Sequence, residues 1–459
     1  MEDSLKLLVV VHHFPPDHIS GAEWQAYRIA RGLRQRGDEA HVICVQSDAR
    51  GPAGQLGYTD GLYDGIPVRR LYFNLPLAPD PFRWSFRNPL VERQILSYLE
   101  DFQPNVLHLI SGYLMSGTVI SASRSLGVPV VLMPMDFWFL CPRVTLLRRD
   151  GSVCDAPEDL VECALCLAQD RRRYRLTARL TGGASNRLLR RLWRSPAVLR
   201  GMGKADLLAA LEERRRYLRG MFRAPDLVIS NSRFLREMLT THGLHNPRFR
   251  QLRQGIDTER WVGDSEKEPS PYLRVGYIGQ IARHKGVDLL VRAFRRLRAQ
   301  GPPPRLLLYG NAEQFPAFTR RLHRLIDGDR RITFAGTFPN ERILEIHSGL
   351  DVLVVPSVWY ENSPNVILEA FAAGTPVIAS DRGGLAELVQ HGVNGLLFRM
   401  GDAGDLAVQL QRVVDQPALL ESLRKGIRPV KTVQEEIAEW LQIYHSVTQG
   451  VEHGWSAVN

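Results

Sequence analysis

The chain of 459 residues is longer than one ordinary hydrophobic core supports, so two or three domains are expected. Apolar residues make up 44% and charged residues 24%, the balance of a globular protein in water, and no apolar run reaches the roughly 20 residues of a membrane span. The N-terminus carries acidic residues rather than a basic stretch before a long apolar run, which argues against a secretion signal and favours a cytoplasmic protein.

The formal net charge of +10 is concentrated in one part of the chain. Residues 171–223 contain sixteen Arg or Lys residues and three acidic residues, a net charge of +13, which leaves −3 for the rest. Any attraction to an anionic surface therefore belongs to this basic segment.

The first half of the chain has the order of elements of an α/β domain. The continuous apolar run 7–11 predicts a strand buried on both faces, as in a parallel sheet. A loop, helical spacing over 22–36 and a strand over 40–45 complete a βαβ unit. Further strands are predicted over 106–110, 130–133 and 227–230. The stretch 136–222 interrupts this alternation and is predicted to be an insertion.

The composition near 262–271 turns to Gly, Asp, Ser, Glu, Lys and Pro, which is typical of a linker. After it the alternation of strands and helices begins again, with a helix predicted over 287–299 and strands over 275–278, 305–309, 332–335, 352–355 and 376–379. We therefore expect two doubly wound α/β domains, residues 1–261 and 272–432, facing each other across a cleft with ligands at the carboxyl ends of the strands. Residues 433–459 are expected to form a helix and tail, the helix packing back near the linker.

One segment of the second domain places acidic residues around the start of a helix. Glu361 lies on a loop after a predicted strand, Ser363 is a suitable N-cap, and Pro364 suits the first helical turn. The helix is predicted to end at Ala373, so that Glu369 lies inside it.

The amides of Asn365 and Val366 would then be among the unpaired N–H groups that favour anions at a helix N-terminus. The carboxylates of Glu361 and Glu369 can accept hydrogen bonds from the vicinal hydroxyls of a sugar and of a ribose. Alternatively, the first is a solvated loop acid and the second a surface helix acid.

A glycine-containing loop, 279–286, follows the strand predicted over 275–278. Its Arg283 and Lys285 are placed to neutralise a diphosphate, the first by its planar fork and the second as a point charge. The loop lacks both the Gly-x-Gly-x-x-Gly spacing of a nicotinamide site and the Gly-Lys-Ser/Thr of a P-loop. The alternative is an ordinary solvated turn.

Taken together, four motifs resemble the family 4 retaining glycosyltransferases of the GT-B fold. They are Arg283-x-Lys285-Gly286, Glu361 and Glu369 with seven residues between them, Ala373-Gly374-Thr375-Pro376-Val377, and Gly383-Gly384-x-x-Glu387. The resemblance covers most of the chain, is strongest over 275–400, and is specific for the family but not for one sugar.

The resemblance implies a hexosyltransferase-like enzyme of polysaccharide biosynthesis, which moves a sugar from a nucleotide diphosphate sugar to an acceptor that is lipid-linked or a glycan. It implies retention at the anomeric carbon and no metal requirement for the transfer. Arg283 and Lys285 would hold the diphosphate, Glu361 would contact the transferred sugar, and Glu369 the ribose. The implied donor-binding residues are Gly279, Arg283, Lys285, Gly310, Asn365, Val366 and Glu369, with the backbone of 335–338 lining the base.

On the acceptor side, Gly21 and Glu23 resemble the glycine-rich loop of the family, although Ser20 replaces a glycine usually seen there. The alternative for Gly21 is a simple helix-entry turn. Met135 is a second departure, because the family commonly has His at this position and Met cannot make its polar contacts.

We expect Asp136 or His108 to take over from the missing His, or the activity to be altered. With Glu361, these two are the candidate catalytic residues, although a histidine at a strand end is often structural.

Four cysteines lie within 26 residues: Cys141, Cys154, Cys163 and Cys166, the last two as a C-x-x-C pair. Cys44 lies in a predicted strand and is expected to be a buried hydrophobe. In a reducing cytoplasm such a cluster predicts a metal site, with structural Zn²⁺ favoured over an iron–sulfur cluster and free thiols as the alternative. The metal would hold the insertion beside the acceptor side.

The basic segment mixes Arg with Leu, Tyr174, Trp193 and Tyr217. This pattern suits an amphipathic surface helix that contacts anionic lipid at the inner face of the membrane and so reaches a lipid-linked acceptor. The alternative is a solvated helical insertion; no nucleic acid partner is expected. Two other functions stay open: a non-catalytic GT-B-like protein that docks through this segment, and another GT-B enzyme such as a nucleotide-sugar epimerase or a phosphorylase.

Overall fold

The computed structural model describes residues 4–18, 20–155, 157–201, 205–258, 267 and 269–450. The chain forms two compact units. The first comprises the chain up to residue 231, residues 235–253 and the C-terminal part from 434, and the second comprises residues 232–234 and 254–433. The predicted linker lies largely outside the described residues.

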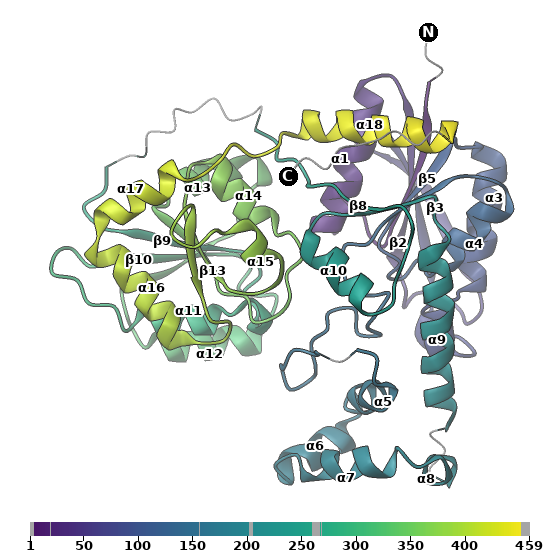
Figure 1. The fold of residues 1–459 in the computed structure, drawn as a ribbon, viewed down its shortest axis with the longest axis horizontal. Coiled ribbons are helices and arrows are strands. Elements are labelled where there is room, and N and C mark those ends of the chain that lie inside the picture. Colours follow the sequence, from purple (N-terminus) through teal and green to yellow (C-terminus); the bar gives the residue numbers. More distant parts are fainter. Residues whose placement is uncertain are drawn as a thin grey trace. The chain divides into compact units, whose positions relative to one another are not determined.

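The described part of the first unit contains one eight-stranded sheet in the order β3-β4-β2-β1-β5-β6-β7-β8 (Figure 1). Neighbouring strands are parallel except β3 and β4, which pair antiparallel as a hairpin at the edge. The strands are β1 (Lys6–Val11), β2 (Glu39–Ser47), β3 (Leu56–Tyr63), β4 (Ile66–Phe73), β5 (Val106–Ile110), β6 (Val130–Met133), β7 (Leu227–Ser230) and β8 (Phe249–Gln251).

Continuous apolar sequence explains the central strands of this sheet. In β1, every residue from Leu7 to Val11 is fully buried, because helices cover both faces of a parallel sheet. In register, Val9 of β1 lies opposite Val42 of β2 on one side and His108 of β5 on the other. The predicted strands of this half are present within one or two residues, whereas the β3–β4 hairpin was not predicted.

The helices of the first unit lie between its strands and at its C-terminal end. They are α1 (Gly21–Gln35), α2 (Pro81–Trp84), α3 (Pro89–Phe102), α4 (Thr118–Ser125), α5 (Leu160–Ala168), α6 (Arg172–Leu180), α7 (Ala184–Leu192), α8 (Pro196–Gly201), α9 (Ala205–Arg223), α10 (Arg233–Thr241) and α18 (Val433–Gln449), with a 3₁₀ turn η1 (Leu75–Leu77). Residues 233–234, at the start of α10, are assigned to the second unit.

The last helix, α18, packs on the first unit beside α1 (Figure 1). A Cβ atom placed on Gly32 of α1 would lie 2.6 Å from Cγ1 of Ile437, so the absence of a side chain there lets the two helices approach. Gln25 of α1 also donates a hydrogen bond to the buried carboxylate of Glu436. These contacts attach the C-terminal end of the chain to its N-terminal unit.

The segment between β6 and β7, residues 134–226, is helical from α5 to α9 and has a small core of its own. Trp193, fully buried, packs there with apolar residues of α5 and α9. The buried members are Ala164, Leu165, Ala168, Trp193 and Leu211. The basic segment is thus a folded layer whose aromatic Trp193 faces inward.

The described part of the second unit contains a six-stranded parallel sheet in the order β11-β10-β9-β12-β13-β14. Its strands are β9 (Arg274–Ile278), β10 (Arg305–Tyr309), β11 (Ile332–Gly336), β12 (Val352–Val355), β13 (Val377–Ser380) and β14 (Gly395–Phe398). Its helices are α11 (Val287–Phe294), α12 (Pro316–Ile326), α13 (Ile343–Ser348), α14 (Asn365–Ala372), α15 (Gly383–Leu388), α16 (Ala403–Asp415) and α17 (Pro417–Lys425), with 3₁₀ turns η2 (Arg283–Lys285) and η3 (Asn340–Arg342).

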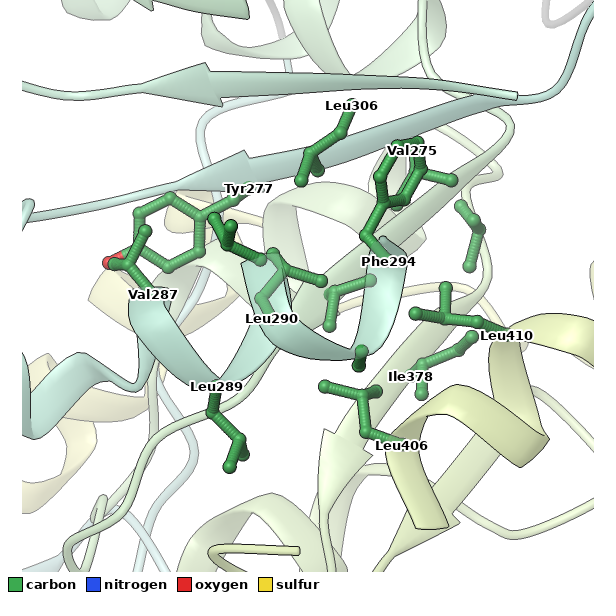
Figure 2. Packing of buried hydrophobic residues seen from close by; sticks show 14 of the residues in the cluster. Val275, Tyr277, Val287, Leu289, Leu290, Phe294, Leu306, Ile378, Leu406 and Leu410 are labelled. Atoms are coloured by element: carbon green, nitrogen blue, oxygen red, sulfur yellow. The ribbon is translucent and has the colours of Figure 1, made fainter. Parts of the chain in front are cut away.

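The core on one face of this sheet is formed around α11 (Figure 2). Leu290 and Phe294 of α11, one helical turn apart, pack with Val275 of β9 and with Leu406 of α16. Each such side chain contributes about 1.5–3 kcal/mol when fully buried. The helix ends at Phe294, earlier than the predicted residue 299, and 3₁₀-type hydrogen bonds from Arg296 and the following residue close its end.

No helix in the described ranges has both the length and the apolar character needed to cross a bilayer.

Candidate functional site

The second unit has its topological switch point between β9 and β12. The chain proceeds from β9 to β10 and β11 on one side of the sheet, and β12, β13 and β14 lie on the other. Ligands of doubly wound sheets bind outside the carboxyl ends of the strands at such a point. The loops that follow β9 and β12 carry the predicted donor residues.

The loop after β9 is held against the loop after β12 by close backbone contact. Gly286 has φ of +71°, and a Cβ atom there would lie 1.9 Å from the carbonyl oxygen of Pro356, so only glycine fits. Val358 N–H donates to the carbonyl of His284 at 2.9 Å. Arg283, which is exposed, and Lys285 lie on the 3₁₀ turn η2 of this loop.

The carboxylate of Glu361 is the polar centre of the second loop. Its Oε1 accepts hydrogen bonds from Lys285 Nζ, Ser357 Oγ and Trp359 Nε1, each at 2.7 Å. Burial alone would raise the pKa of Glu361, but the charge of Lys285 and these three hydrogen bonds outweigh burial and lower it. The structure therefore holds an ionised carboxylate beside the predicted phosphate-binding lysine.

Trp359, on the loop after β12, packs against the loop after β9. Lys285 Nζ lies 5.0 Å from the centre of its ring, and the His284 ring lies 4.6 Å away. Burial, with a further contribution from the charge of Lys285, lowers the pKa of His284 to about 4. His284 is therefore neutral near pH 7, and the positive charge on this side of the loop is that of Lys285.

The glycine pair 383–384 brings α15 against the Glu361 loop. Gly384 N–H donates to the carbonyl of Glu361 at 2.9 Å, and a Cβ atom on Gly384 would lie 1.4 Å from the carbonyl oxygen of Asn362. Ser380, at the end of β13, donates through Oγ to the carbonyl of Ser357 at 2.8 Å. This motif therefore supports the position of Glu361.

Helix α14 begins one residue later than the sequence predicts. Pro364, with φ of −71° and ψ of 120°, occupies the N-cap position, and Ser363 does not cap the helix. The amide of Gln254 instead donates to the carbonyl of Ser363 at 2.8 Å and contacts the side chain of Asn365. Asn365 and Val366 are the first two helical residues, as the donor-site prediction requires.

Glu369 of α14 lies beside a histidine that the sequence did not indicate. Nε2 of His347, on α13, is 4.0 Å from Oε2 of Glu369, and His347 is fully buried. Burial, followed by the charge of Lys267, lowers the pKa of His347 to about 3, so this ring is neutral.

Two further predicted donor residues lie at neighbouring strand ends. Gly279 N–H donates to the carbonyl of Tyr309 at 3.1 Å, and Gly310 N–H donates to the carbonyl of Gly336 at 2.8 Å. The rings of Tyr309 and Phe338 meet edge to face with centroids 5.5 Å apart. The structure thus brings the ends of β9, β10 and β11 together beside the backbone predicted to line the base.

In the first unit, polar residues gather where β1, β5 and β6 end, again at the switch point of the sheet. Asp136, after β6, accepts hydrogen bonds from Ser111 Oγ at 2.5 Å and from Trp138 N–H at 2.8 Å. Burial raises the pKa of Asp136, and the two hydrogen bonds and the charge of His12 oppose the rise.

His12 follows β1 directly, and the sequence did not single it out. Its Nε2 lies 3.2 Å from Oε1 of Glu23, a buried residue in the first turn of α1 that also accepts a hydrogen bond from Ser20. Burial would raise the pKa of Glu23, but His12 and Ser20 lower it to about 2. Gly21 is the first residue of α1, and the space around its Cα is open.

His108, a predicted catalytic candidate, is covered by α18. It lies within β5, is fully buried, and its Nδ1 is 2.7 Å from the hydroxyl of Tyr444 on α18, while its ring packs at 4.6 Å against Trp440. These contacts favour a packing role for His108, and its catalytic role stays a prediction. Met135 is partly buried and lies 3.2 Å from the side-chain nitrogen of Asn231.

The four clustered cysteines line one cavity in the first unit: Cys141, Cys154, Cys163 and Cys166. All are free thiols, as is Cys44, which is buried in β2. As the side chains lie, no three His, Cys, Asp or Glu residues of the described ranges converge on a common metal position.

Comparison with known proteins agrees with this architecture. Residues 19–260 match the family described as Glycosyltransferase Family 4, and residues 272–416 match the family Glycosyl transferases group 1. The chain belongs to Glycosyltransferase Family 4. A glycogen synthase of Mycobacterium tuberculosis strain H37Rv is 32% identical over 179 residues, which are 39% of this chain. That match spans only 42% of the relative's length.

Solved structures show the same fold over nearly the whole chain. A sucrose-phosphate synthase from Thermosynechococcus elongatus superposes with a TM-score of 0.66 at 20% identity, covering 97% of this chain and all of that one. Anabaena HepE, solved in complex with UDP, gives a TM-score of 0.65 at 17% identity, covering 96% of this family 4 chain and all of its own. The predicted GT-B fold with two Rossmann-like sheets is confirmed.

Proposed function

We propose that this protein is a retaining glycosyltransferase that moves a sugar from a nucleotide diphosphate sugar to an acceptor. The observation that carries the proposal is the pairing of Lys285 with the buried, ionised Glu361 at the switch point of the second sheet. A cation for the diphosphate and a carboxylate for sugar hydroxyls stand there on adjacent loops.

The chemistry requires stabilisation of a leaving diphosphate as the bond between the anomeric carbon and oxygen breaks. Lys285, Arg283 and the first amides of α14 supply positive charge and N–H donors where that charge develops. Loss of one such contact typically lowers the rate by about 10²–10³. The proposal includes no side chain that acts as a covalent nucleophile.

The test is a thermal-shift titration of the full chain with UDP-, GDP-, ADP- and dTDP-sugars, followed by turnover assays with and without acceptor. Arg283→Met is expected to weaken nucleotide-sugar binding, whereas the matched change Arg330→Met, at an exposed arginine of the same unit, is expected to leave it unchanged. The absence of any nucleotide-sugar shift, or equal effects of the two variants, would contradict the proposal.

The same assays separate the other functions. A non-catalytic binding protein would show a shift without turnover. An epimerase would convert the donor sugar without acceptor and without release of the nucleotide diphosphate.

On the acceptor side, we infer that His12 and Asp136 supply the polar contacts that Met135 cannot make. Both lie at the carboxyl ends of strands in the first sheet, and the charge of His12 acts on Asp136. His12→Gln is expected to reduce transfer while nucleotide-sugar affinity stays unchanged. An unchanged kcat for transfer would contradict this role.

A peripheral contact with anionic lipid is proposed for helices α6 and α7. Leu176 and Leu180 of α6 and Leu188 and Leu192 of α7 are exposed, and Leu180 is 85% exposed. Arginines accompany these leucines on both helices, and each would contribute about 1 kcal/mol at an anionic surface. Trp193, one of the three aromatic residues noted in this segment, is not part of this surface, because it is fully buried.

Sedimentation with vesicles of phosphatidylglycerol and phosphatidylcholine tests this contact. Binding is expected at low salt and is expected to fall as salt is raised or when Leu180 and Leu188 are both replaced by Ser. Val408→Ser, an exposed apolar residue of α16, is the matched control. Failure to bind at low salt would leave the alternative of a solvated helical layer.

A further inference from the structure

The four clustered cysteines come from three separate pieces of backbone that converge on one cavity. Cys141 lies in a turn after β6, in which its N–H donates to the carbonyl of Phe137 at 2.7 Å. Cys154 closes a short hairpin, since its N–H donates to the carbonyl of Leu146 at 2.7 Å. Cys163 and Cys166 are three residues apart on α5 and therefore share one helix face.

The cavity between these pieces is lined by all four cysteines together with apolar neighbours, two arginines and the acidic Glu162. Cys141 is buried and the other three are partly buried. No disulfide joins any of the five cysteines of the chain, all of which are described. Four thiols gathered in one place, without disulfides, match the ligand set of a closed tetrahedral metal site.

A second observation concerns charge. Arg214 of α9 is only 3% exposed, and Cys141, Cys163 and Asp136 are the ionisable groups near its guanidinium. It donates a hydrogen bond to the carbonyl of Trp138. A buried cation is costly unless it is compensated, and here Asp136 and the carbonyl of Trp138 compensate it in part. Thiolates at Cys141 and Cys163 would add to this compensation.

Further cationic groups stand at the rim of the same cavity. Arg143 and Arg148 line it, and Nη2 of Arg148 lies 3.7 Å from Sγ of Cys154. A divalent ion bound by four thiolates carries a net charge of −2, which Arg148 would offset in part, while Arg143 is also paired with Asp170 at 2.7 Å. The cationic groups around the cavity are therefore compatible with a metal thiolate centre.

We propose that Cys141, Cys154, Cys163 and Cys166 bind one structural Zn²⁺ that fixes the helical segment after β6. Binding converts four thiols into thiolates and releases four protons to solvent, with no change of oxidation state. No three of the thiols converge on a common metal position in the described residues, so binding requires their side chains to rotate toward one centre. The ion would link the turn after β6, the hairpin and α5, and would so fix the part of the helical segment that precedes α6 and α7.

The experiment measures metal content and thiol reactivity in the purified full chain. We expect about one zinc ion per chain in the unaltered protein and in Cys44→Ser, whose cysteine lies outside the cluster. Cys163→Ser is expected to lose the zinc. In the native protein the four thiols should resist an aromatic disulfide reagent until a chelator is added.

Arg214→Met provides a variant that keeps every ligand. It is expected to weaken zinc retention in a chelator competition by about 10–100-fold, as loss of a supporting group does at other metal sites. Circular dichroism shows whether each variant still folds. If Cys163→Ser does not fold, the zinc content of the unaltered protein, and its release by a chelator, still show whether the chain binds zinc.

Three results would overturn the proposal. The first is the absence of stoichiometric metal after incubation with zinc and desalting, with the four thiols freely reactive. The second is stoichiometric iron with visible sulfur-to-iron absorption, which would assign an iron–sulfur cluster. The third is a pair of disulfides found by mass spectrometry without reduction.

Discussion

Replacing Lys285 by Met tests whether the buried carboxylate of Glu361 depends on that lysine. Met preserves much of the length and apolar volume of the side chain but removes the Nζ group that lies 2.7 Å from Glu361. Breaking a buried ion pair typically costs about 3–5 kcal/mol, because the remaining charge is left uncompensated. Here the side chain of Lys285 is 24% exposed, and Ser357 and Trp359 still donate to the carboxylate, so we expect about 2 kcal/mol.

The dependence on pH distinguishes this effect from lost packing. In the unaltered protein the folded-state pKa of Glu361 is lowered, so its contribution to stability is present above the ordinary value of about 4.3 and is lost as the pH falls through the folded pKa. Without Lys285, burial is the largest remaining influence and raises the folded pKa of Glu361. The deficit of Lys285→Met is therefore largest near pH 7 and shrinks as the pH falls and the carboxyl takes up a proton.

The assay is thermal unfolding of the full chain for Lys285→Met, Glu361→Gln and the double variant at neutral and mildly acidic pH. A cost of about 2 kcal/mol lowers Tm by about 4–8 °C in a unit of this size. The double variant should recover part of this loss, because the buried charge is gone. Lys425→Met is the control, since Lys425 pairs at 3.6 Å with Glu421 on the surface, where ion pairs contribute about 0–1 kcal/mol. Additive effects within about 0.5 kcal/mol, or a deficit that is the same at both pH values, would refute the reasoning.

Two other substitutions test positions that the structure explains. Gly384→Ala forces a methyl group against the carbonyl of Asn362, 1.4 Å away, so we expect a loss of about 1–3 kcal/mol in thermal unfolding and weaker nucleotide-sugar binding in a titration. His108→Leu leaves the buried hydroxyl of Tyr444 without its partner, so the free energy of unfolding should fall by about 1–3 kcal/mol. If His108 has only a packing role, kcat stays unchanged, and a strongly reduced kcat would support its predicted catalytic role. Burial lowers the pKa of His108 to about 3. As the pH falls from about 6.5 towards 3, the unfolded chain therefore binds one proton more than the folded protein, and the folded protein loses stability. His108→Leu removes this proton-binding group, so the stability of the variant should fall less steeply over the same pH range.

The central strands could be predicted from sequence because their apolar runs are continuous. Strands β5, β6 and β12 match their predicted bounds, since parallel strands covered on both faces leave an unambiguous pattern. The hairpin strand β3 was missed because most of its residues are exposed and it contains two glycines, so no apolar alternation marks it. Strand β14 was missed because its short sequence lies at the edge of the sheet, where a four-residue apolar run is ambiguous.

The donor-site residues lie in local motifs with a recognisable spacing, and the structure brings Lys285 and Glu361 into contact. His12 and His347 were missed because each lies beside a carboxylate of another element, and the sequence does not show this proximity. The burial of His108 could not be predicted for the same reason. Nothing near it in sequence indicates that α18, from the far end of the chain, covers it.

The polar side chains at the strand ends of the two sheets differ in how strongly they depend on one another. This difference affects how well each group tolerates a substitution. In the second unit, Glu361 depends on Lys285 and on the close backbone contact at Gly384, so a substitution at either position disturbs the same carboxylate. In the first unit, His12 after β1 pairs with Glu23 in the first turn of α1, and Asp136 after β6 has separate hydrogen bonds to Ser111 and Trp138. Residues on separate loops can be exchanged one at a time without loss of the scaffold. Met135, in place of the family's usual His, is accommodated beside Asn231, whereas a comparable change at Lys285 or Glu361 would disturb the whole group of contacts around that carboxylate.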